Sequence, residues 1–191
     1  MRKALSLTLL VVGVASASAQ VAAPVPAIKA AGAVGADAAY DYNASVTLSR
    51  EDIAGDRFAQ TSRQLFEAYL SHEGIRGLAA SVARGRFEAV LGNNAEFARE
   101  HADSLTLSFA TVNAGGEERF AQRTRFKYNG RDVTVYRYRQ GMGSASSVFI
   151  DGQEAKGPDG RPLQFFTKDR ETYLKFKAWF EGTLGRPEAR P

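Results

Sequence analysis

The stretch FKYNGRDVTVY, residues 126–136, determines how the second half of this 191-residue chain folds. Asn129 and Gly130 stand between two runs of β-forming residues whose polarity alternates. Asn-Gly is the preferred two-residue loop of a type I′ β-hairpin, because both central residues of that turn need positive φ angles. The sequence therefore predicts an antiparallel hairpin in which the numbers of facing residues sum to 259.

This register divides the side chains of the hairpin between two faces. Phe126 and Val133 make one face apolar near the turn, and Gln122, Arg137 and Arg139 make it polar farther away. The opposite face combines cationic side chains with tyrosines. Guanidinium groups stack on phenol rings and bind carboxylates or phosphates. We therefore interpret the opposite face as a candidate surface for an anionic ligand or a protein partner. The alternative is an ordinary solvated face. The candidate binding residues on it are Arg123, Arg125, Lys127, Tyr136 and Tyr138.

Period-two alternation predicts further strands on both sides of the hairpin. An edge strand is expected over residues 40–48, and others over 105–110, 147–150 and 163–166. The serine- and glycine-containing segment 140–147 is expected to be a flexible loop beside the hairpin.

Helical spacing dominates the residues between the edge strand and the hairpin. A helical stretch is expected over 49–74, opened by a capping-box pair, Ser49 and Asp52, and divided at Gly55. A second helix is expected over 75–92 with an interruption at Gly85, and a short third helix from Asn93 or Asn94 to Ala102. A last amphipathic helix is expected over 169–184, docked on the sheet.

Runs of helices followed by runs of strands predict an α+β domain. We expect the N-terminal helices and the C-terminal helix to pack on an antiparallel sheet of four to five strands. This order of elements is similar to that of the cone-like nuclear-transport-factor-2-like folds, from which the C-terminal helix departs. The similarity concerns the fold alone.

The first residues have the pattern of an export signal. A basic start, an apolar run over 4–15 and the sequence Ala17-Ser18-Ala19 predict a signal peptide over 1–19, cleaved before Gln20. The apolar run is too short to cross a bilayer, so no transmembrane span is expected. A flexible leader of small residues over 20–39, one domain over 40–184 and a frayed tail over 185–191 complete the predicted organisation.

Composition excludes several classes of function. The chain contains no cysteine and two histidines, which excludes thiol catalysis and leaves little for a metal site, so we expect no cofactor and no metal. Loss of residues 1–19 would remove two of the 25 basic residues against 21 acidic ones, leaving a net charge of +2. So small an excess does not favour nucleic acid as a partner.

Candidates for catalysis are weak. His72 precedes Glu73, and His101 lies two residues before Asp103, so each could act as a general base. Both are better explained by positions at helix ends, where a cation is favoured. Ser144 lacks the glycines that a nucleophile elbow requires on both sides.

The leading hypothesis is an exported, periplasmic or secreted, non-catalytic binding protein that engages a protein partner or an anionic envelope polymer. A second is a small hydrolase or lyase with a pocket between sheet and helices and a histidine base. A third is an inhibitor or immunity-type partner of a secreted enzyme.

Overall fold

A computed structural model describes residues 41–141, 143–157, 159–161, 163, 165 and 167–186. The predicted signal peptide over 1–19 and leader over 20–39 lie outside the described residues, as does the tail beyond Arg186. None of the helices in the described part of the chain is long and apolar enough to cross a bilayer.

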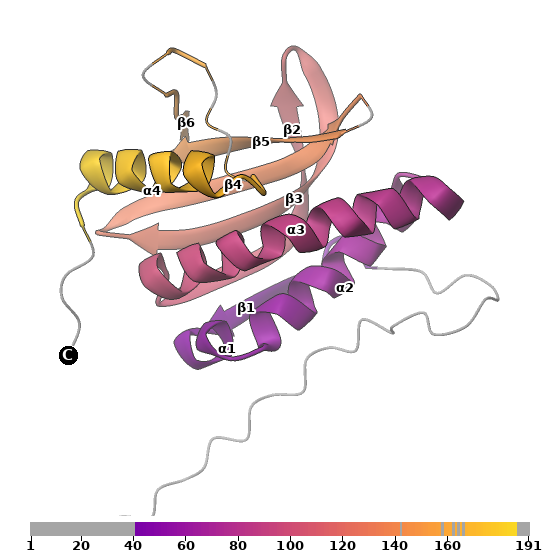
Figure 1. Cartoon of the computed structure of the whole chain (residues 1–191), viewed down its shortest axis with the longest axis horizontal. Coiled ribbons are helices and arrows are strands. Elements are labelled where there is room, and N and C mark those ends of the chain that lie inside the picture. The colour runs from indigo at the N-terminus through magenta and orange to yellow at the C-terminus, as the bar shows by residue number, and fades with distance from the viewer. Residues whose placement is uncertain are drawn as a thin grey trace, which may run out of the picture.

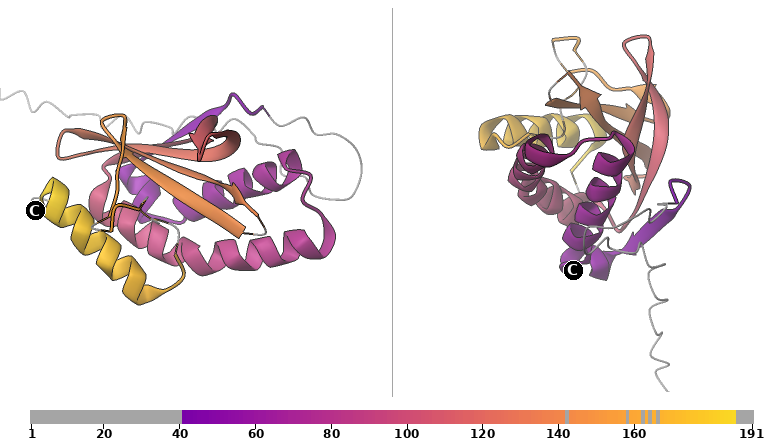
Figure 2. Two further views of the ribbon diagram at one scale, coloured as in Figure 1. Left: turned by 90° about the horizontal axis from the view of Figure 1, so that it is seen from above. Right: turned by 90° about the vertical axis from the view of Figure 1, so that its right-hand side faces the viewer.

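The fold is α+β, as predicted. Six antiparallel strands form one sheet in the order β1-β2-β3-β4-β5-β6, one more than the upper expected number. The longer helices α2, α3 and α4 lie on one side of the twisted sheet (Figures 1 and 2). The elements are β1 (Ser45–Ser49), α1 (Arg50–Ala54), α2 (Arg57–His72), α3 (Gly77–His101), β2 (Ser104–Ala114), β3 (Glu117–Tyr128), β4 (Arg131–Gln140), β5 (Gly143–Ile150), β6 (Gln153–Glu154) and α4 (Arg170–Leu184).

The β3–β4 hairpin has the predicted turn and register. Asn129 and Gly130 have φ angles of 47° and 77°, as a type I′ turn requires. Facing pairs run from Tyr128 with Arg131 to Ala121 with Tyr138, so each pair sums to 259. The division of side chains between two faces therefore follows the sequence prediction.

The main core lies between the inner face of the sheet and the helices. Val133, Val135 and Val148 supply the strand side and are almost fully buried. Phe97 of α3 and Phe180 of α4 meet above them with ring centroids 5.0 Å apart. The Phe180 ring centroid also lies 4.9 Å from that of Tyr128 in β3, which confirms that α4 docks on the sheet. This packing also holds the C-terminal half of α3 in a fixed position.

Helix α3 differs from the prediction because it runs unbroken for 25 residues. Gly85 and Gly92 lie on its exposed side, and neither interrupts it. A glycine inside a helix costs about 1 kcal/mol relative to alanine, whereas burial of a phenylalanine side chain contributes about 1.5–3 kcal/mol. Burial of Phe87, together with Val90 and Leu91, outweighs both glycines.

The expected loop over 140–147 is also wrong, since β5 begins at Gly143. Pairing of Gln140 with Gly143 and of Arg139 with Ser144 extends the β4–β5 ladder to this end. Residues 163 and 165 are not in a strand, although one was predicted there. Their neighbours 162, 164 and 166 lie outside the described residues.

Candidate functional site

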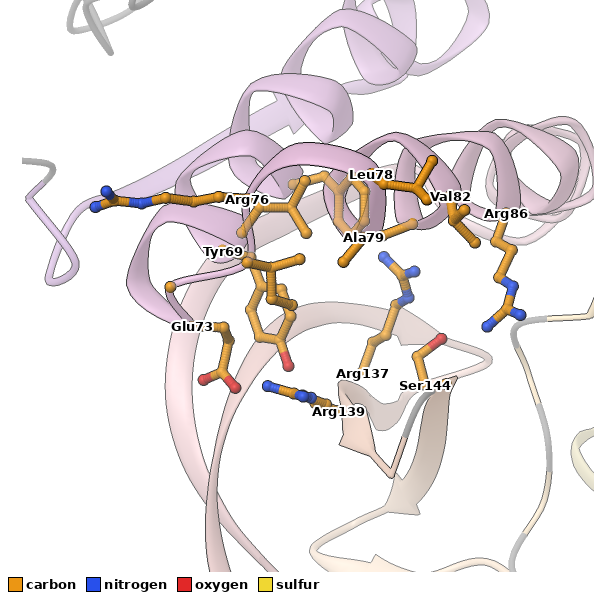
Figure 3. A pocket seen from close by; sticks show the side chains of 16 residues that line it. Tyr69, Glu73, Arg76, Leu78, Ala79, Val82, Arg86, Arg137, Arg139 and Ser144 are labelled. Carbon is orange, nitrogen blue, oxygen red and sulfur yellow. The ribbon is translucent and has the colours of Figure 1, made fainter.

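A hollow of about 660 Å³ lies between the α2–α3 turn and the end at which β4 turns into β5 (Figure 3). Its upper wall comes from the end of α2 and the first turns of α3, and its floor from the inner face of the sheet. Such a volume lies within the range of small-molecule sites. The lining residues are Phe66, Tyr69, Leu70, Glu73, Gly74, Ile75, Arg76, Leu78, Ala79, Val82, Ala83, Arg86, Arg137, Arg139, Gly143 and Ser144.

The turn between α2 and α3 is set by a Schellman motif. Gly74 adopts a φ angle of 64°, which a residue with a side chain rarely does. The Ile75 amide donates to the Leu70 carbonyl (2.9 Å) and the Gly74 amide to that of Ser71 (3.1 Å). The motif reverses the chain so that the first turn of α3 lies over the end of β4.

Arg137 forms the floor of this pocket. Its side chain is on the same face as Val133 and Val135, and the residue is only 6% exposed. The guanidinium carbon lies 4.6 Å from the ring centre of Phe66 and 5.1 Å from that of Phe87, and Nη1 donates to Gln122 Oε1 (3.1 Å). Burial lowers the pKa of Arg137 to about 10, so the group remains charged at neutral pH.

Tyr69 adds a buried hydroxyl to the same wall. The residue is 5% exposed, and Figure 3 shows its oxygen directed toward the sheet beside Arg139. Within the described residues Tyr69 Oη makes no hydrogen bond of standard geometry, although the Arg139 backbone amide faces it. Burial, followed by the charge of Glu73, raises the Tyr69 pKa to about 12. The hydroxyl is therefore available to a ligand as a hydrogen-bond donor.

The charges around the pocket are mainly positive. Four arginines and one glutamate line it, giving a formal excess of three positive charges. Helix α3 adds to this, since its N-cap residue Arg76 makes no side-chain capping bond to the first turn. An uncapped helix N-terminus attracts anions. The remaining lining is largely aliphatic and aromatic, so the pocket is suited to an anion with an apolar body.

The predicted binding residues lie elsewhere, on the outer face of the hairpin. Arg125 and Lys127 are exposed, and Lys127 pairs with Asp132 across the strands (3.2 Å). Arg123 is half-buried, and its Nε donates to Ser108 Oγ (3.0 Å). The structure therefore places these cations on one face, as predicted, and away from the pocket.

The two tyrosines of that face are less accessible than the sequence interpretation required. Tyr138 is buried against Val112, Ala121 and Ala145, and its hydroxyl lies 3.2 Å from Ser147 Oγ. The expectation of an exposed Tyr138 is wrong, because the outer side chains of adjacent strands pack on one another. Tyr136 is half-buried, with its ring edge-on to Phe149.

Neither histidine lines the pocket. His101 is fully buried, and its Nδ1 donates to the Phe97 carbonyl (2.9 Å), which leaves Nε2 facing Glu181 (3.1 Å). Glu100 completes a group of three possible metal ligands, but the Lys177 ammonium already balances its charge. The group is explained as a charge network linking α3 to α4.

His72 is in the last turn of α2, as the helix-end interpretation predicted. Its ring stacks on Phe120 with centroids 3.6 Å apart, and its Nδ1 lies 3.4 Å from Glu73 Oε1. Only Glu73 of this pair lines the pocket. The geometry therefore gives no support to a histidine base within this pocket.

Sequence reasoning placed Arg137 and Arg139 on the inner face and did not single them out. The signal in the sequence was the alternation along β4. Arg137 and Arg139 are the next alternate residues after Val133 and Val135, so all four side chains share one face. A cation that alternates in phase with core residues is more unusual than one on a solvated face.

Comparison of the chain with protein-family models, curated proteins and solved structures finds no significant match. The similarity in element order to the nuclear-transport-factor-2-like folds therefore stays a prediction.

Proposed function

We propose that this chain is an exported, non-catalytic binding protein that holds a small organic anion in the pocket between the α2–α3 turn and β4–β5. The observation that carries the proposal is the Arg137 guanidinium on the pocket floor, charged at neutral pH and only 6% exposed. Hydrogen bonds between a guanidinium and an anion are about twice as strong as those between neutral groups. An anionic ligand on the floor would make such bonds in addition to the contacts that Arg137 already has within the fold, with Tyr69 as a neutral donor beside it.

Support for a binding role, in preference to the hydrolase or lyase alternative, comes from the distribution of titratable groups. The lining offers guanidinium groups and one carboxylate, whereas general acid–base catalysis at neutral pH most often uses a histidine. His101 lies in the core, and His72 stacks on Phe120 outside the lining. Binding of an anion, in contrast, does not require a general acid or base.

The test is titration with anilinonaphthalene sulfonate, an aromatic anion whose fluorescence rises when it leaves water. Arg137→Gln should weaken its binding roughly tenfold or more, since a hydrogen bond to a charged group contributes about 1.5–3 kcal/mol. Arg137→Lys keeps the charge and should retain part of the affinity.

Arg123→Gln is the matched control, because Arg123 is also an arginine of the hairpin that donates to one polar side chain. It should leave dye binding unchanged. Equal affinity in wild type and Arg137→Gln, with both folded by circular dichroism, would contradict the proposal.

A second candidate is the outer face of the hairpin as a surface for an anionic envelope polymer. It is favoured by the register, which places Arg123, Arg125 and Lys127 at alternate positions of β3 on that face. Charge reversal of Arg123 and Arg125 to glutamate should lower the salt concentration at which the protein leaves a sulfated-polysaccharide column. Unchanged elution would eliminate this surface.

A further inference from the structure

The pocket has a charged floor and an apolar edge. In most pockets the buried part is apolar and the edge that faces water is polar, so the arrangement here is reversed. Arg137 on the floor is 6% exposed, whereas Leu78 and Val82 at the edge are 81% and 46% exposed. Among the described residues the remaining large apolar side chain with high exposure is Leu174 of α4. Two of these three side chains therefore border one site.

Leu78 and Val82 act as one surface, because residues four apart lie on the same side of a helix. Both belong to the first turns of α3, and Ile75 and Ala79 continue the apolar wall beside them. A compact anion held by Arg137 would leave this strip in water. A ligand with a hydrocarbon chain would cover it.

We infer that the pocket binds a single-chain alkyl or acyl anion head first, with the charged group against Arg137 and the chain over Leu78 and Val82. This inference rests on the proposed function and deepens it by naming the class of ligand. The Tyr69 hydroxyl and the N-terminus of α3 lie on the wall that the head group would meet. The chain leaves through the apolar edge.

Butanoate, octanoate and dodecanoate, each below its micellar concentration, test this by displacing anilinonaphthalene sulfonate. Affinity should rise with chain length by up to about fourfold for each methylene group buried. Dodecanol, which has the chain without the charge, should compete at least tenfold more weakly than dodecanoate, since its head group lacks the charge-assisted bond to Arg137.

Leu78→Gln and Val82→Gln should each flatten the dependence on chain length, because they weaken the binding of dodecanoate more than that of butanoate. Both positions are exposed, so neither change disturbs the core. Leu174→Gln is the matched control, since Leu174 has the same 46% exposure as Val82 and does not line the pocket. It should retain the full dependence.

The outcomes separate this inference from the function on which it rests. Equal affinity for butanoate and dodecanoate, with dye binding still dependent on Arg137, would refute the placement of the hydrocarbon chain over Leu78 and Val82. The proposal that the pocket binds anions would be unaffected. Equal competition by dodecanol and dodecanoate would overturn the placement of the head group. Failure of the dye and every carboxylate to bind would overturn both.

Discussion

Replacement of Arg137 by methionine should stabilise the folded protein while weakening anion binding roughly tenfold or more. Methionine has a similar length and packs well against aromatic rings, so it can occupy the place of the guanidinium over Phe66 and Phe87. The substitution removes a buried charge. Gln122 loses its donor, but its half-buried side chain retains access to water.

The magnitude follows from the electrostatics of Arg137. Burial lowers its pKa from 12.5 to about 10, which at about 1.4 kcal/mol per pH unit is a penalty of about 3 kcal/mol on the charged form. Below pH 10 both folded and unfolded chains are protonated, so the penalty is fully present at pH 7. It is relieved only as the pH rises from about 10 toward 12.5.

Favourable contacts of Arg137 offset part of this penalty. Stacking on the rings contributes about 1 kcal/mol, and the bond to Gln122 contributes another ~1 kcal/mol. Arg137→Met should therefore raise the free energy of unfolding by at most about 1 kcal/mol, measured by urea denaturation at pH 7. Arg123→Met, on the outer face, should leave it within about 0.5 kcal/mol of wild type. A destabilisation of Arg137→Met by more than 1 kcal/mol would show that the charge holds the fold together, and would refute the reasoning.

Two further predictions concern the glycines and acid stability. Gly74→Ala should lower the free energy of unfolding by about 1 kcal/mol, because alanine tolerates the positive φ of this position poorly. Gly92→Ala should raise it by up to about 1 kcal/mol, because alanine favours the helix and its Cβ meets no neighbouring atom. Urea denaturation of both variants measures these changes. The pKa of Glu96 is held below 4.5, mainly by hydrogen bonds from Arg170, so its contribution to stability is present above that pH and lost as the pH falls through the lowered value. Glu96→Gln should flatten the loss of stability between about pH 5 and pH 3, and an unchanged pH profile would contradict the assignment.

The hairpin could be predicted because its cause is local. Asn129 and Gly130 accept positive φ angles, and the alternation on both sides fixes which face each side chain takes. The capping box at Ser49 and Asp52 was predictable for the same reason, since it depends on four successive residues.

The errors arose where packing between distant segments decides the outcome. Gly85 and Gly92 carry the local signal of a break, and the apolar side of α3 overrides it by packing in the core. Gly143 and Ser144 carry the local signal of a loop, and pairing with β4 overrides it.

The pocket combines both kinds of information. Hairpin register alone puts Arg137 on the inner face, but nothing local to β4 says whether that part of the face is covered. The cover comes from Gly74, which reverses the chain more than sixty residues earlier and brings α3 over the strand. A candidate site of this kind becomes visible from sequence only when a cation in phase with core residues is considered together with the element that will lie over it.

The inner row of β4 makes the strongest argument for a ligand. Val133 and Val135 are buried beneath the helices, and Arg137 is the next residue of the same row. An aliphatic residue at this position would continue the core, pack on Phe66 and Phe87, and avoid the desolvation of a guanidinium. The position instead holds a cation at the bottom of a hollow bordered by exposed apolar side chains. Capture of an anion with an apolar body accounts for the charge, the hollow and the exposed edge together.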